Sequence, residues 1–240
     1  MTLKVVIQCA GSKNPDAGFW KHQDRKVIFV AEPARCSKSA SISCYRPDDA
    51  IPGTNKTWRQ ELEEYNQECK QTGRNPCGLC KAYELYKPKR DKCIYKDIVE
   101  TYGERNVFIL SAGWGLVRAG YLLPNYDITF AQQAESWKRR RNDDEYRDFN
   151  QFAESVKEDD AIYFFGGKDY LPLYYQLTWN LPGTTVIYYW GKKPVIGDEP
   201  RKHNYKFREC PVTKKECPSI FARNWYYICA KAFVKGKSEK

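Results

Sequence analysis

Four hydrophobic segments of the sequence each end in a short run of small and charged residues. They span residues 3–8, 107–110, 161–165 and 185–190, and β-branched and aromatic residues make them typical of buried strands. Helical patterns separate them, and alternating strands and helices favour a parallel sheet whose strand ends share one edge. The sequence therefore predicts an α/β fold, with a mainly parallel sheet of four to five strands flanked by helices.

A further strand is predicted at residues 26–30, and a loop rich in serine, proline and aspartate follows it. Because a loop of that length inside a compact domain is usually functional or disordered, residues 31–57 are predicted to be a long insertion after the first strand. Helical segments are predicted at residues 58–69, 79–85, 94–102 and 137–156, with another helix beginning near Tyr170.

The length of 240 residues fits one large domain, which we expect to span residues 1–200. Residues 201–240 are predicted to be a basic C-terminal extension rich in cysteine and aromatic residues. Within this extension, residues 202–217 are expected to form a charged, hairpin-like loop, and residues 219–233 a terminal element.

Composition and charge indicate the kind of partner and the compartment. A formal net charge of +10 favours a polyanionic partner, most often nucleic acid, and a chain that is merely basic is the alternative. No apolar run reaches the ~18 residues of a membrane span, and the N-terminus is typical of a short strand rather than a signal peptide. The chain is therefore predicted to be cytoplasmic, without a membrane partner, and its ten cysteines are predicted to be reduced thiols.

Two of the cysteines, Cys77 and Cys80, have the spacing of a zinc knuckle. The cysteines that would supply further ligands are spread over the chain: Cys36, Cys44, Cys69, Cys93, Cys210, Cys217 and Cys229. One C-x-x-C without a clear second pair leaves two interpretations open, a structural zinc site or free buried thiols. The chemistry expected of the chain requires no cofactor in either case.

The turns after the four strands carry glycine, lysine and aromatic residues, and we expect them to meet at one edge of the sheet. Gly11-Ser12-Lys13 lacks the spacing of a P-loop, which argues against a nucleotide triphosphatase. Such residue types suit a pocket that stacks a planar group and holds a phosphate or sugar, although each glycine pair is also typical of an ordinary turn. The predicted binding residues are Cys9, Gly11, Ser12, Lys13, Ser111, Gly113, Trp114, Gly115, Tyr126, Gly166, Gly167, Lys168 and Tyr170, and the turn at Gly191 and Lys192 joins them.

Asp127 is the predicted catalytic residue, with Asn125 beside it and Asp169 sharing the role or capping the next helix. Neither histidine of the chain lies in a triad setting, so chemistry based on a carboxylate is favoured. A carboxylate can stabilise an oxocarbenium ion at a sugar carbon or activate the water that attacks it, as cleavage of an N-glycosidic bond requires. The alternative is that Asp127 is a helix N-cap or turn residue.

Next to Trp137, four consecutive cations form a dense basic cluster: Lys138, Arg139, Arg140 and Arg141. On a helix, these side chains would neutralise DNA phosphates while the indole packs below them. A solvated charged face is the alternative interpretation of such a run.

Three motifs, CAGSK, ILSAGWGL with PNYDITF, and FFGGKDYLPLYY, together resemble the YaaA-like superfamily of α/β proteins. The closer resemblance is to the branch that contains an anti-phage DNA glycosylase removing glucosylated hydroxymethylcytosine. It covers about residues 5–190 and implies a glycosylase-like fold, an active site at the strand ends and action on modified bases in DNA. The cysteine-rich segments depart from that pattern.

These observations predict a DNA glycosylase that flips a modified nucleotide out of the stack and leaves an abasic site. Trp114, Tyr126 and Tyr170 are expected to stack on the flipped base, and residues 31–57 to line a wide pocket. Two other functions stay open, a hydrolase or transferase acting on free nucleosides or nucleotides, and a DNA-binding stress protein without enzymatic activity. Neither the modified base nor the oligomeric state follows from the sequence.

Overall fold

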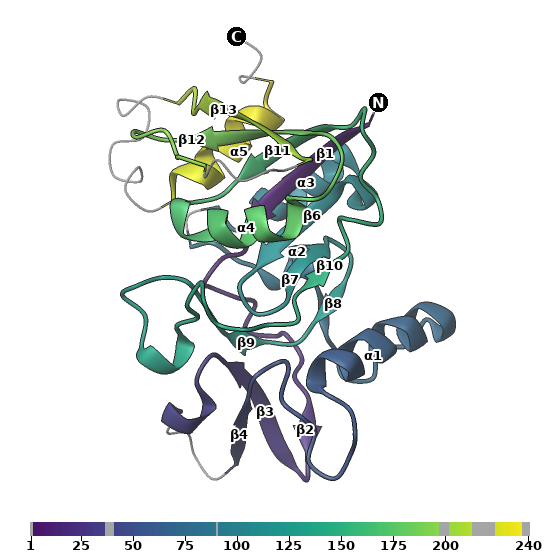
Figure 1. Cartoon of the computed structure of the whole chain (residues 1–240). Helices are drawn as coiled ribbons and strands as arrows, with labels where there is room; N and C mark the ends of the chain where they lie inside the picture. The colour runs from purple at the N-terminus through teal and green to yellow at the C-terminus, as the bar shows by residue number, and fades with distance from the viewer. Residues whose placement is uncertain (1, 37–40, 90, 197–201, 213–223, 237–240) are drawn as a thin grey trace.

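The computed structural model describes residues 2–36, 41–89, 91–196, 202–212 and 224–236 (Figure 1). Its core is a seven-stranded sheet in which every neighbouring pair is parallel except β6 with β7. The order across the sheet is β10 (Phe149–Asn150), β7 (Gly115–Arg118), β6 (Val107–Ser111), β1 (Leu3–Gln8), β11 (Ala161–Phe165), β12 (Thr184–Tyr189) and β13 (Asn204–Glu209). The predicted α/β class with a mainly parallel sheet is confirmed, and the sheet has more strands than the four to five expected.

Helices cover both faces of this sheet, because successive side chains of a strand point to opposite faces. From β11, Phe164 stacks on Tyr174 of α4 (Leu171–Thr178) with ring centroids 4.3 Å apart. Its neighbour Phe165 points the other way, toward Phe233 of α5 (Trp225–Val234) at 5.3 Å. Helix α3 (Ile94–Tyr102) packs beside α5, so that α4 lies on one face and α3 and α5 on the other (Figure 1).

A second, smaller sheet forms from the chain that leaves β1 (Figure 1). Its central strand β3 (Arg25–Val30) pairs with β2 (Lys21–His22), β4 (Ile42–Tyr45) and β9 (Tyr126–Asp127). Helix α1 (Trp58–Thr72) follows. It begins with a capping box in which Thr57 and Gln60 satisfy each other's backbone N–H groups, and it buries Trp58, Leu62 and Tyr65 on one side.

The helix predicted at residues 79–85 is confirmed for its last four residues, and a short strand takes the place of its start. Strand β5 (Cys80–Lys81) pairs antiparallel with β8 (Leu122–Leu123), and only α2 (Ala82–Leu85) is helical. Four 3-10 turns complete the described elements: η1 (Pro33–Arg35), η2 (Glu104–Asn106), η3 (Ser136–Lys138) and η4 (Lys168–Tyr170).

The predicted helix over residues 137–156 is wrong. The structure has η3 and the two-residue strand β10 there, and the chain between them is irregular. This segment is dense in charge and lacks an apolar stripe at helical spacing. Its backbone bonds to another segment instead, because the N–H of Arg140 donates to the Thr129 carbonyl at 2.9 Å.

The hairpin-like loop predicted at residues 202–217 is also wrong where the structure describes it. Strand β13 pairs in parallel with β12 at the edge of the large sheet, and α5 packs on β11 and β12. These parts of the expected C-terminal extension therefore belong to the main layer. Cys217 and residues 219–223 lie outside the described residues, as do residues 37–40 of the predicted insertion, which contains η1 and β4.

The prediction that every cysteine is a reduced thiol is wrong for one pair. Cys36, after η1, and Cys44, in β4, form a disulfide with Cα atoms 6.6 Å apart.

Over the described ranges, no helix is long and apolar enough to cross a membrane.

Candidate active site

Three of the predicted strand-end turns meet in a buried cluster of polar side chains. The hydroxyl of Tyr126 lies 2.8 Å from Ser111 Oγ, at the end of β6, and 2.8 Å from the hydroxyl of Tyr86. At the end of β1, Cys9 Sγ lies 3.2 Å from the hydroxyl of Tyr170, which follows β11. Because β6, β1 and β11 are parallel neighbours, their ends share one edge of the sheet, and these hydrogen bonds join the turns there.

Burial keeps the tyrosines of this cluster protonated. It raises the pKa of Tyr86, Tyr126 and Tyr170 well above the ordinary value of 10.0, and the neighbouring Cys9 adds to the rise in each case. At neutral pH all three hydroxyls therefore keep a proton to donate.

The turn after β11 is attached directly to β1. The N–H of Gly167 donates to Gln8 Oε1 at 2.5 Å, and the hydroxyl of Tyr95 donates to the Gln8 carbonyl at 2.7 Å. Gly166 is buried, whereas Lys168 and Asp169 project as exposed side chains. The fourth turn is separate, since Gly191 and Lys192 are exposed at the end of β12, two strands away from β1.

Lys13 is the half-buried cation of this edge, and its Nζ lies 4.0 Å from the centroid of the Tyr126 ring. Burial lowers the pKa of Lys13, the nearby Cys9 and Asp127 partly restore it, and Lys138 lowers it further. The two preceding residues frame the turn: Gly11 is exposed, and the Ser12 carbonyl accepts a hydrogen bond from the Lys87 N–H at 3.0 Å.

Asp127 lies in β9, paired with Val30 of β3, and its side chain is half-buried. The sequence predicts Asp127 in a turn after a strand of the main sheet, whereas the structure has it in a strand of the small sheet. The adjacent Tyr126 bonds to Ser111 at the end of β6, and Lys13 lies over its ring. The Asp127 carboxylate, which raises the pKa of Lys13, therefore belongs to this edge. Asn125 faces a different neighbour through its backbone, because its N–H donates to the Gly18 carbonyl at 3.2 Å.

The turn between β6 and β7 requires glycine at Gly115, whose φ is +85°. A Cβ there would lie 2.4 Å from the Phe149 carbonyl oxygen, and one at Gly113 would lie 3.1 Å from the Tyr126 ring. Trp114 between them is completely buried, with its ring 5.0 Å from Phe29. This turn is a packed corner.

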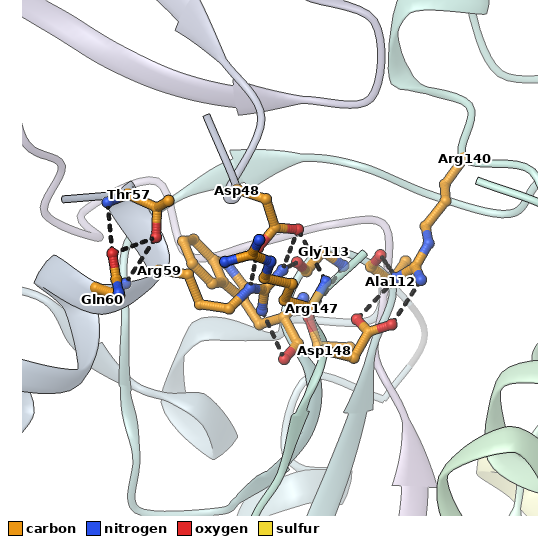
Figure 2. Close-up of polar contacts among 11 residues, drawn as sticks. Asp48, Thr57, Arg59, Gln60, Ala112, Gly113, Arg140, Arg147 and Asp148 are labelled. Carbon is orange, nitrogen blue, oxygen red and sulfur yellow. Dashed lines mark hydrogen bonds and ion pairs between the residues drawn. The ribbon is translucent and has the colours of Figure 1, made fainter. Parts of the chain in front are cut away.

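Two arginine–aspartate pairs hold the carbonyl groups of that corner, and both arginines are buried (Figure 2). In the first pair, Arg59 of α1 donates to both carboxylate oxygens of Asp48, at 2.6 and 3.2 Å. The same guanidinium donates to the carbonyls of Gly113 and Trp114, each at 3.2 Å. The Arg147 N–H adds a bond to Asp48 at 3.1 Å, so one carboxylate links three segments of the chain.

The second pair is Arg140 with Asp148 (Figure 2). Arg140 donates to the two carboxylate oxygens at 2.9 and 2.6 Å and to the Ala112 carbonyl at 2.9 Å. Its guanidinium also lies 3.8 Å from the centroid of the Tyr146 ring. Only 4% of the Arg140 side chain and 3% of the Asp148 side chain are exposed, so this ion pair is part of the core.

Beside this pair is a cavity of about 340 Å³. It is lined by Phe130, Gln132, Arg139, Arg140, Arg141, Asn142 and Asp169. Phe130 connects it to the strand ends, since its ring lies 5.0 Å from that of Tyr170. Of the predicted catalytic carboxylates, Asp169 lines this cavity, whereas Asp127 is not among its lining residues.

Burial corrects two of the predicted roles. Trp114, Tyr126 and Tyr170 expose 0%, 1% and 7% of their surface, so they do not form a platform for a flipped base. Arg140 is committed to Asp148 and Ala112, so it is not a surface contact for DNA phosphates. The remaining cations of the cluster, Lys138, Arg139 and Arg141, keep exposed surface on an irregular segment.

Sequence reasoning missed Asp48, Arg59 and Asp148. No spacing connects them with the corner that they support, because Arg59 lies 54 and 55 residues from its carbonyl partners. Only a local feature of the sequence could have indicated Arg59. Arg59 stands on the buried side of a helix one residue after Trp58, where an arginine needs a partner.

Cys77 lies in the turn before β5, and Cys80 is the first residue of that strand. Asn75 organises the turn, donating to the Leu79 carbonyl and accepting from the Leu79 N–H. Across the described ranges, no group of three or more His, Cys, Asp or Glu residues is placed to hold a metal ion.

His203 is buried, and its Nε2 lies 2.6 Å from Thr185 Oγ1 in a core contact.

Comparison of the chain with protein-family models, with curated proteins and with solved structures finds no match. The resemblance to the YaaA-like superfamily therefore stays a prediction that depends on the three motifs.

Proposed function

We propose that this protein is a DNA N-glycosylase that removes a modified base, with glucosylated hydroxymethylcytosine of phage DNA as the expected substrate and antiviral defence as the role. One observation carries the proposal. Asp127 and Lys13, a carboxylate and a partly buried amine, come together at the edge where three parallel strands end. Lys13 Nζ lies 4.0 Å from the ring centroid of Tyr126, the residue before Asp127, and the Asp127 carboxylate raises the pKa of Lys13. That edge is where open α/β folds place their ligands.

The pair supplies the two groups that breaking a bond between sugar and base requires. As the base departs, positive charge develops on the sugar ring, and the Asp127 carboxylate stabilises it or activates the attacking water. Lys13 donates a proton to the departing base, and its lowered pKa makes the ammonium a stronger acid than an exposed lysine. The water oxygen ends on the sugar carbon, which leaves an abasic site.

The basic residues beside the site support DNA as the partner. Lys138, Arg139 and Arg141 lie on one segment that borders the strand ends, and the formal net charge of the chain is +10. These cations would neutralise phosphates on either side of the target nucleotide, which predicts binding that weakens as salt concentration rises.

The test uses two DNA substrates of identical sequence, one unmodified and one carrying glucosylated hydroxymethylcytosine. After incubation with folded protein, hot alkali converts abasic sites to strand breaks. The proposal expects breaks in the modified DNA, fewer with Asp127→Asn, and an unchanged circular dichroism spectrum for the variant. Intact strands in both substrates would contradict it.

A second candidate is an N-glycosidase acting on free nucleotides, and the size of the cavity favours it. About 340 Å³ falls within the range of small-molecule pockets, at its lower end. Release of base from a mononucleotide, with none from a DNA strand, would replace the first proposal with this one.

A further inference from the structure

The cavity beside Phe130 has a cationic wall. Three consecutive arginines, Arg139, Arg140 and Arg141, line it together with the amide side chain of Asn142. Asp169 is its only carboxylate among the lining residues that the structure describes. Arg139 and Arg141 have weak contacts, since Arg139 donates to the Gln132 carbonyl at 3.3 Å and Arg141 lies 3.6 Å from Glu32.

Arg140 differs from its two neighbours because it is fixed in place. Asp148, the Ala112 carbonyl and the Tyr146 ring hold its guanidinium in one orientation. Its Nε is buried as well, so Arg140 forms a fixed part of the cavity wall rather than a free donor.

We propose that this cavity binds one phosphate group, which accepts hydrogen bonds from the guanidinium groups of Arg139 and Arg141. Arginine presents several donors in one plane, which matches the oxygen atoms of a phosphate. Arg139 and Arg141 have few competing contacts to give up, and the fixed Arg140 keeps the wall of the cavity in place.

Arg140 also connects the phosphate to the proposed chemistry. The same guanidinium that lines the cavity holds the Ala112 carbonyl, one residue after Ser111 of the strand-end cluster. A phosphate bound there would lie next to the corner that positions the site. This inference rests on the proposed function only for the source of the phosphate, which is a DNA strand in the first candidate and a free nucleotide in the second.

The direct test observes the Arg139 and Arg141 Nε–H signals by NMR in protein labelled with ¹⁵N-arginine, assigned by side-chain correlation, while inorganic phosphate is added. The inference expects these signals to shift and to saturate, and it expects the double variant Arg139→Gln, Arg141→Gln to bind phosphate at least about tenfold more weakly in a calorimetric titration. A matched control removes two charges at exposed residues elsewhere, Arg74→Gln with Arg105→Gln, and should bind within about twofold of wild type. Arg105 precedes β6, at the strand end opposite the site.

Arg139 and Arg141 Nε–H signals that do not move at any phosphate concentration, or equal weakening in the two double variants, would overturn the inference. Two further titrations identify the source. A deoxycytidine 5′-monophosphate probe tests the free nucleotide, and an oligonucleotide without terminal phosphates tests the strand. A phosphate site without release of base from either probe leaves this inference standing and counts against the proposed function alone.

Discussion

Removing the carboxylate of Asp148 should destabilise the protein more than any exposed charge change. The Asp148→Asn substitution keeps the size of the side chain and removes its charge. It leaves the Arg140 guanidinium buried, with the Ala112 carbonyl and a weakened amide contact as its partners.

The magnitude follows from burial. Both side chains of the pair are at most 4% exposed, so water does not compensate the remaining charge. Breaking a buried pair from one side costs about 3–5 kcal/mol. Against a total stability of about 5–15 kcal/mol for a folded protein, that is a large share.

Urea denaturation followed by tryptophan fluorescence measures this loss. The matched control is Glu64→Gln, which removes one partner of the exposed ion pair with Lys56 and should cost less than about 1 kcal/mol. The double change Arg140→Met, Asp148→Leu should cost less than Asp148→Asn does, because no charge is left buried. A free energy of unfolding for Asp148→Asn within about 1 kcal/mol of wild type would refute the reasoning.

Three other predictions concern His203, Gly115 and the pair Arg139 and Arg141 of the basic cluster. Burial lowers the pKa of His203 below its ordinary value of 6.5, so unfolding takes up a proton and stability should fall as the pH drops below about 6.5. In His203→Gln this fall should flatten, as urea midpoints measured across the acidic range would show. Gly115→Ala should cost more than Gly191→Ala, because both glycines have positive φ but only the Gly115 Cβ would meet backbone atoms; equal thermal midpoints would contradict this. Exchanging Arg139 and Arg141 for glutamine should reduce the salt dependence of DNA binding, and an unchanged slope would exclude them as phosphate contacts.

Elements with a strong local pattern could be predicted from the sequence. The helix at residues 94–102 matches α3, because Ile94, Tyr95 and Ile98 form a buried stripe at helical spacing. The strands at 3–8 and 161–165 likewise match β1 and β11, since each is an apolar run long enough for a buried parallel strand.

Elements that depend on distant partners could not be predicted in the same way. In strand β13, Tyr205 and Phe207 alternate with polar and charged residues, which is the pattern of a half-buried strand. The many charges around these two aromatic residues made the segment resemble a loop. The Arg59 and Arg140 pairs are further from prediction, because the sequence does not show which distant carbonyl groups these arginines will bind, up to 55 residues away.

The most direct test of the account is the rate at which the free modified base is released from glucosylated DNA by wild type and by Asp127→Asn, measured by mass spectrometry. The account predicts that the variant still binds the DNA but releases base on the order of 10³-fold more slowly. Base release at the wild-type rate from the folded variant would contradict the assignment of Asp127 as the catalytic carboxylate.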